Sequence, residues 1–255
     1  MHSYRSNFQN EEIHLRYYEE VIPELEEILD VKDLATLAKV FICRDVSIKY
    51  VLINSMMAYK RGYSVQNQKG GLKVLDCTYD LVNYLEENKE TIAFKNKKVL
   101  DLGCGPGILG IYALLKGASV VFQDYNKEVL VYSTIPNVIL NMEEEQIDQR
   151  TKSSKFYSGE WLSFDRELEE SEKFDIILTS ETLSNLKNHN KLIALLEHRL
   201  KDEGMIFIAA KSYYLGVGGG ARHFESAIKN SCLKSEIIWK TSDKTEREIL
   251  KLKKS

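Results

Sequence analysis

One stretch, residues 98–110, constrains the fold more than any other part of this sequence. It runs Lys-Val-Leu-Asp-Leu-Gly-Cys-Gly-Pro-Gly-Ile-Leu-Gly and opens an apolar pattern of helical spacing that continues to Lys116. An apolar run, a glycine cluster and a helix pattern together predict a strand, a tight turn and a helix, with glycines where a ligand must approach the backbone. Gly105, Gly107 and Gly110 also fit the dinucleotide pattern GxGxxG, which alone is a weak signal.

The acid Asp101, two residues before the first glycine, separates two kinds of ligand. A dinucleotide loop presents helix N–H groups to a pyrophosphate, which a nearby carboxylate would repel. A ligand that carries an ammonium group and no phosphate, such as S-adenosylmethionine, would instead be attracted. The next predicted strand, Ser119–Phe122, is followed by Asp124, where an acid can accept both ribose hydroxyls of an adenosine. Either acid alone could simply cap a helix or turn, but together they predict a methyltransferase core.

The rest of the chain alternates strand and helix patterns, which is typical of an α/β protein. We expect a Rossmann-like class I methyltransferase fold, with a seven-stranded, mostly parallel sheet and helices on both faces. Residues 1–64 are predicted to be an N-terminal extension, with a loosely held arm over residues 1–20, and residues 65–255 the methyltransferase domain. Residues 40–53 fit a strand or a helix equally well. The further strands are expected at Lys155–Ser158, Phe174–Ser180, Met205–Ala210, Ser235–Trp239 and Arg247–Leu252.

Composition excludes several other classes of protein. With 255 residues, 44% of them hydrophobic, the chain can bury a substantial core, and its net charge of −3 gives no strong field for nucleic acid. Its four cysteines and five histidines are scattered, so neither a metal site nor a disulfide framework is expected. The sequence contains no apolar run of membrane-spanning length. A soluble, monomeric protein of the cytoplasm or nucleus is the expectation.

In a parallel α/β sheet the ligand binds outside the carboxyl ends of the strands, so the residues there are the candidate site. Trp161 could stack on adenine or merely cover the sheet edge. Ser180 to Thr182 could face the methyl acceptor or cap a helix, and the glycine-rich loop over residues 216–220 could be a substrate lid or a plain connection. The cofactor-binding candidates at these ends are Asp101, Gly103, Cys104, Gly105, Gly107, Asp124, Tyr125, Asn126, Gly159, Glu160, Trp161 and Ser180.

Taken together, several segments resemble the histidine protein methyltransferase family, whose members methylate a histidine of a large-subunit ribosomal protein of the L-three type. The likeness covers roughly residues 65–255, and its more specific parts are Phe-Gln-Asp-Tyr-Asn, Gly-Glu-Trp and Gly-Val-Gly-Gly-Gly. It implies S-adenosylmethionine as cofactor, the tele nitrogen of histidine as acceptor, and Lys73 and Cys77 as further cofactor contacts. The segments that carry it are residues 70–74, 97–110, 122–126, 135–138, 159–161, 179–182 and 214–220.

The transfer requires little acid–base chemistry, because a neutral imidazole nitrogen already carries a free electron pair. The enzyme must align the ring and fix its tautomer through a hydrogen bond to the other nitrogen. Glu181 and Asn185 are the candidate catalytic residues for that bond.

The sequence departs from the family pattern at Lys69, at Leu75-Asp76 and at Ser184, which weakens the substrate assignment more than the cofactor assignment. A methyltransferase of protein lysine or of a small imidazole compound therefore stays open. So does a cofactor-binding partner of ribosome assembly without turnover.

Overall fold

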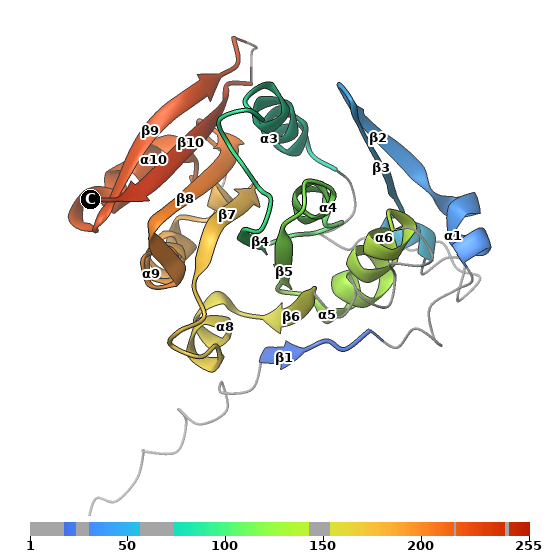
Figure 1. Ribbon diagram of the computed structural model, residues 1–255. Helices are drawn as coiled ribbons and strands as arrows, with labels where there is room; N and C mark the ends of the chain where they lie inside the picture. Colours follow the sequence, from blue (N-terminus) through green and yellow to red (C-terminus); the bar gives the residue numbers. More distant parts are fainter. Residues whose placement is uncertain (1–17, 24–30, 57–73, 143–153, 217, 243–244) are drawn as a thin grey trace, which may run out of the picture.

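A single eight-stranded sheet organises the computed structural model, which describes residues 18–23, 31–56, 74–142, 154–216, 218–242 and 245–255 (Figure 1). The four central pairings, which join β6, β5, β4, β7 and β8, are parallel, whereas β1 and β10 pair antiparallel with their neighbours. Across the sheet the order is β1 (Tyr18–Glu20), β6 (Lys155–Gly159), β5 (Ser119–Asp124), β4 (Lys98–Leu102), β7 (Phe174–Ser180), β8 (Leu200–Lys211), β10 (Arg247–Lys254) and β9 (Leu233–Lys240).

All seven strands expected from the sequence are present, and the last two form the antiparallel pair that their spacing indicated. The eighth strand was not predicted. Tyr18 to Glu20, at the end of the supposed arm, pairs with β6 and extends the sheet at that edge. The ring of Tyr18 stacks on that of Tyr157 with centroids 5.3 Å apart, so burial of an aromatic side chain helps to keep this short strand in place.

Helices cover both faces of the sheet, as the alternation predicted (Figure 1). In β4 the side chains alternate: Val99 packs in the cluster with α3 and α4, while Leu100 and Leu102 pack in the cluster with α8, α9 and α10. The helices are α3 (Asp76–Glu87), α4 (Ile108–Leu115), α5 (Lys127–Val129), α6 (Ile135–Leu140), α8 (Trp161–Glu167), α9 (His189–Arg199) and α10 (Ala221–Ala227).

The ambiguous segment around residues 40–53 is a β-hairpin of β2 (Lys39–Cys43) and β3 (Val46–Tyr50). Its inward side chains, among them Phe41 and Ile48, are fully buried and belong to the same core cluster as Val99 of the central strand. The hairpin and the helix α1 (Val31–Leu37) therefore pack onto the domain that follows. The expected boundary at residues 64 and 65 lies outside the described residues.

Pro136 lies in a helix that is irregular just before it. The helix passes from α5 through a π-helical turn, η1 (Leu130–Thr134), into α6, whose second residue is Pro136. Proline has no N–H to donate to the preceding turn, so the wider turn accommodates it. One consequence concerns the glycine turn: the Thr134 hydroxyl donates to the carbonyl of Gly105 at 2.6 Å.

Candidate functional site

Asp101 sits under the glycine turn at the end of the central strand. Its side chain is buried, and its Oδ2 accepts the N–H of Gly110 in the first turn of α4 at 2.8 Å. Gly107 begins that helix with φ of +80°, a left-handed conformation that favours glycine. Burial raises the pKa of Asp101 to about 8; the Gly110 N–H opposes this shift, and the nearby Asp124 adds to it. A buried acid that is costly to ionise would be stabilised by a cationic ligand.

Asp124 is the last residue of the neighbouring strand, β5, and its carboxylate contacts the glycine turn. Its Oδ2 accepts the N–H of Gly105 and its Oδ1 the N–H of Asn126, both at 3.0 Å. Burial raises the pKa of this carboxyl, and the N–H groups of Asn126, Gly105 and Tyr125 oppose the shift. Asp124 is thus a rigid acceptor that still reaches solvent-accessible space, as a hydroxyl-binding acid requires.

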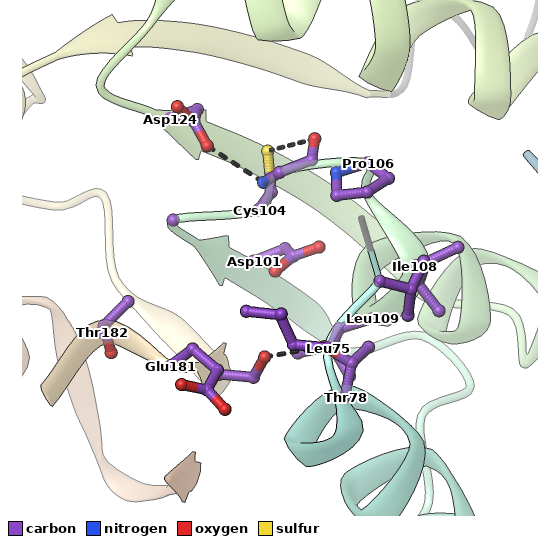
Figure 2. A pocket seen from close by; sticks show the side chains of 14 residues that line it. Leu75, Thr78, Asp101, Cys104, Pro106, Ile108, Leu109, Asp124, Glu181 and Thr182 are labelled. Atoms are coloured by element: carbon purple, nitrogen blue, oxygen red, sulfur yellow. Dashed lines mark hydrogen bonds between the residues drawn. The ribbon is translucent and has the colours of Figure 1, made fainter. Parts of the chain in front are cut away.

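A cavity of about 210 Å³ brings most of the predicted residues together. Figure 2 shows Asp101 in its middle, with Asp124 and Glu181 to either side in this view. Thr78 of α3 and Ser180 of β7 also line it, and their hydroxyl oxygens lie 2.8 Å apart. The predicted residues in its lining are Asp101, Gly103, Cys104, Gly105, Asp124, Ser180 and Glu181.

A neighbouring cavity of about 240 Å³ shares Gly103 and Asp124 with the first. It is lined further by Tyr125, Gly159, Glu160 and Trp161, all predicted, and by Asn188 and Lys191. Lys191 Nζ lies 2.9 Å from Glu160 Oε1 across its mouth. Asp124 therefore lines both cavities, the one that Asp101 lines and the one that contains the rings of Tyr125 and Trp161.

Three of the described residues that were predicted to bind the cofactor do not line either cavity. Cys77 is fully buried in α3. Gly107 is the N-cap residue of α4, and Asn126 donates its N–H to Asp124. Burial, and then the Glu181 carboxylate beside it, raise the pKa of the Cys77 thiol, which therefore stays protonated. Lys73 lies outside the described residues.

The two predicted catalytic residues occupy different surroundings. Glu181 lines the first cavity with a left-handed backbone, φ +61°, and its Oε2 accepts the hydroxyl of Tyr214 at 2.6 Å. Asn185 does not line it: its Oδ1 accepts the N–H of Lys187 at 3.1 Å and caps the short helix η4 (Leu186–Asn188). The structure thus brings Glu181, and not Asn185, to the cavity.

Sequence reasoning missed several residues of the two cavities. Val74 and Leu75 directly precede α3, and Thr78 lies in its first turn. Tyr214 was noted only as part of a family-like segment, and its contact with Glu181 spans 33 positions of sequence. The missed cavity residues are Val74, Leu75, Thr78, Ile108, Leu109, Asn188 and Lys191.

The site combines fixed acids, exposed aromatic rings and backbone from a glycine turn. Such a set suits a ligand with a cation, a diol and a flat ring system. Among the described residues no cluster of three or more His, Cys, Asp or Glu side chains could hold a metal ion. No helix in the described ranges is long and apolar enough to cross a membrane.

Comparisons with known proteins agree with this arrangement. A family model described as a methyltransferase domain matches residues 93–252. A histidine protein methyltransferase 1 homolog from Dictyostelium discoideum is 44% identical over 181 residues, which cover 71% of this chain and 53% of that protein. The Bos taurus homolog is 40% identical over 183 residues, covering 63% and 48%. The chain thus spans about half the length of the curated relatives it matches.

A solved structure adds support for the fold alone. A Streptococcus mutans protein assigned as a S-adenosylmethionine-dependent methyltransferase superposes with a TM-score of 0.59 at 13% identity, covering 85% of this chain and 55% of that one. With the acid pair on the glycine turn and the family match over most of the chain, this chain belongs to the methyltransferase-domain family and has its class I Rossmann-like fold.

Proposed function

We propose that this protein transfers a methyl group from S-adenosylmethionine to a ring nitrogen of a protein histidine. The observation that carries the cofactor half is that Asp101 and Asp124 line one cavity beside the glycine turn, where Asp124 accepts the N–H of Gly105 and Asp101 that of Gly110 in the helix that follows. The histidine half is supported by the relatives, which are named histidine protein methyltransferases. The tele nitrogen is the proposed acceptor atom, as the family resemblance implies.

The residues present fit the cofactor. Asp101 would face its ammonium group and Asp124 its ribose hydroxyls, while Tyr125 and Trp161 offer rings for the adenine. The cofactor supplies, when bound, an electrophilic methyl group on a sulfonium. Because a neutral imidazole nitrogen is already a nucleophile, the chain's contribution is to bind, align and exclude water.

We assign the acceptor contact to Glu181. A carboxylate that accepts the pros N–H of the imidazole would leave the tele nitrogen with its electron pair toward the methyl group. Glu181 lines the cavity at the carboxyl end of β7, and its backbone N–H donates to the carbonyl of Ala209 at 2.9 Å, which fixes its position. Asn185 is proposed only as an alternative, because its side chain already caps η4.

The acceptor segment needs a route to this point. A third cavity, of about 550 Å³, lies at the same edge of the sheet, after β8 and before β10, and includes Lys211, Tyr214 and Glu246. Tyr214 joins it to Glu181. We infer that the residues flanking the acceptor histidine enter here, because the space is large enough for polypeptide side chains and Tyr214 in its lining bonds to Glu181 in the lining of the first cavity.

The proposed partner is a large-subunit ribosomal protein, bound by a monomeric enzyme in the cytoplasm or nucleus. The test is incubation with cofactor labelled in its methyl group and with purified large-subunit ribosomal proteins, followed by hydrolysis of the labelled protein. Label in tele-methylhistidine is expected. Label in lysine, or only in a small imidazole compound such as carnosine, would replace the acceptor, and no label in any acceptor would indicate a cofactor-binding protein without turnover.

A further inference from the structure

Tyr214 is a half-buried residue just beyond β8 that no part of the proposed mechanism yet uses. Its hydroxyl donates to Glu181 Oε2 at 2.6 Å, the distance of a short, charge-assisted hydrogen bond. The N–H of Lys211 donates to the same hydroxyl oxygen at 3.4 Å. The phenol hydroxyl thus donates one hydrogen bond and accepts another, and its proton points to the carboxylate.

The backbone around Tyr214 is attached to the segment that carries Glu181. The N–H of Tyr214 donates to Gly219 at 2.9 Å, and the N–H of Gly218 returns to the Tyr214 carbonyl at 3.1 Å. The N–H of Gly220 then donates to the carbonyl of Leu183 at 2.9 Å. A Cβ on Gly219 would lie 2.2 Å from that carbonyl, so glycine is required for this close approach. The glycine-rich loop therefore holds Tyr214 in register with the turn after β7.

Glu181 needs such support. Its left-handed backbone, φ +61°, is uncommon for a residue other than glycine. Burial raises the pKa of Tyr214 above its usual range, and the Glu181 carboxylate raises it further. The phenol therefore stays neutral at physiological pH and remains the donor of this bond.

Tyr214 also lines the cavity through which the acceptor is proposed to enter. It stands between that cavity and the residue that would contact the imidazole. We propose that Tyr214 is a positioning residue for methyl transfer: its hydroxyl holds the Glu181 carboxylate where the acceptor ring meets it. This inference rests on the proposed role of Glu181.

The test is a double-mutant cycle with Tyr214→Phe and Glu181→Gln, measured as kcat for histidine methylation and as Kd for S-adenosylmethionine. Loss of a charge-assisted hydrogen bond corresponds to roughly 10–100-fold in rate, so Tyr214→Phe is expected to lower kcat by that factor while Kd changes less than about twofold. In the Glu181→Gln background the same substitution should lower kcat by less than about twofold, because its target is gone. Tyr79→Phe is the matched control, since Tyr79 is 37% exposed and lines none of the three cavities described above.

Each outcome separates the inference from the proposed function. If the wild-type enzyme labels no histidine, the proposed function fails. If the wild-type labels histidine and Tyr214→Phe keeps its kcat, or loses the same factor in both backgrounds, Tyr214 does not act through Glu181. Should Tyr214→Phe fail to bind cofactor, Tyr214→His, which retains a donor, completes the cycle; equal loss of kcat with it in both backgrounds overturns the inference.

Discussion

Asp101 and Asp124 end adjacent parallel strands, line one cavity, and are both buried at a cost to their ionised forms. Asp124 accepts a backbone N–H from the glycine turn and Asp101 one from the first turn of α4, yet burial outweighs these bonds and raises both pKa values. Burial disfavours the ionised form of both carboxyls, so the site gains from a cationic ligand. The site therefore favours an ammonium group over a phosphate.

The first prediction concerns protons. With its pKa raised to about 8, Asp101 is mostly protonated at pH 7 in the free protein. Contact with an ammonium group stabilises the carboxylate, so binding of S-adenosylmethionine at pH 7 should release up to about one proton. Calorimetry in buffers of different ionisation enthalpy measures this number from the slope of the apparent enthalpy.

Asp101→Asn is the matched variant, because an amide oxygen can still accept the Gly110 N–H. It should bind the cofactor more weakly and release no proton. Undiminished proton release from this variant would assign the effect to another group.

The second prediction concerns the ribose. Asp124→Ala should weaken S-adenosylmethionine binding by about 1.5–3 kcal/mol, the range for charge-assisted hydrogen bonds. Part of that loss comes from the turn, since Gly105 and Asn126 lose their acceptor. Asp124→Asn keeps one acceptor oxygen and should lose less. Titration calorimetry decides, and an affinity unchanged in Asp124→Ala would remove this residue from the site.

The third prediction concerns pH and stability away from the site. His198 of α9 lies 2.9 Å from Asp165 and 3.0 Å from Glu170, and hydrogen bonds to Asp165 first, then to Glu170, raise its pKa. A raised folded-state pKa stabilises the protein fully below the ordinary value of about 6.5, and this stabilisation is lost as pH rises through the folded-state pKa. The wild type should therefore be more stable than His198→Gln at pH 6, and this difference in unfolding free energy should be smaller at pH 8.5.

Urea unfolding at both pH values measures that difference. His223→Gln is the control, since His223 is exposed on α10. A wild-type minus His198→Gln difference that is independent of pH would mean that the imidazolium contributes nothing through these carboxylates.

The part of the site that follows strand ends was predictable from the sequence. Asp101 and Asp124 each come directly at the end of an apolar run, and the parallel topology puts such ends at one edge. Residues whose role depends on which atoms their side chains contact could not be predicted from the sequence. Asn185 could point to an acceptor, but a backbone N–H two residues away captures its oxygen. Cys77 follows a family motif, yet the helix period turns it into the core.

The same limit applies to the fold. The seven strands with strong apolar runs were predicted, because burial on both faces leaves a clear pattern. The three residues of β1 carry no such pattern, and their strand exists only because β6 offers an open edge. The hairpin of β2 and β3 was ambiguous, since its segment mixes β-branched residues with charged ones. Packing against the core decided in favour of strands.

The last prediction compares Asn137 of α6 with Asn141, the residue that follows this helix. Asn137 accepts the N–H of Val51 at 2.6 Å and donates to the carbonyls of Val51 at 3.1 Å and Pro106 at 2.8 Å. Asn141, one turn later, pairs with the N–H and carbonyl of Lys49 at 2.9 and 2.7 Å. Both tie the hairpin segment to α6, but only Asn137 also reaches the glycine turn.

Asn137→Ala should therefore lower both stability and cofactor affinity, whereas Asn141→Ala should lower stability alone. Removal of the buried Asn137 amide leaves the Val51 N–H without its partner, at a cost of about 1–3 kcal/mol in unfolding free energy. The loss at Asn141 should be smaller, because water can replace its bonds near the surface. Thermal unfolding and calorimetric Kd for S-adenosylmethionine measure the two effects. Equal Kd values for S-adenosylmethionine in the two variants would show that the hydrogen bond from Asn137 to Pro106 does not affect cofactor binding at the glycine turn.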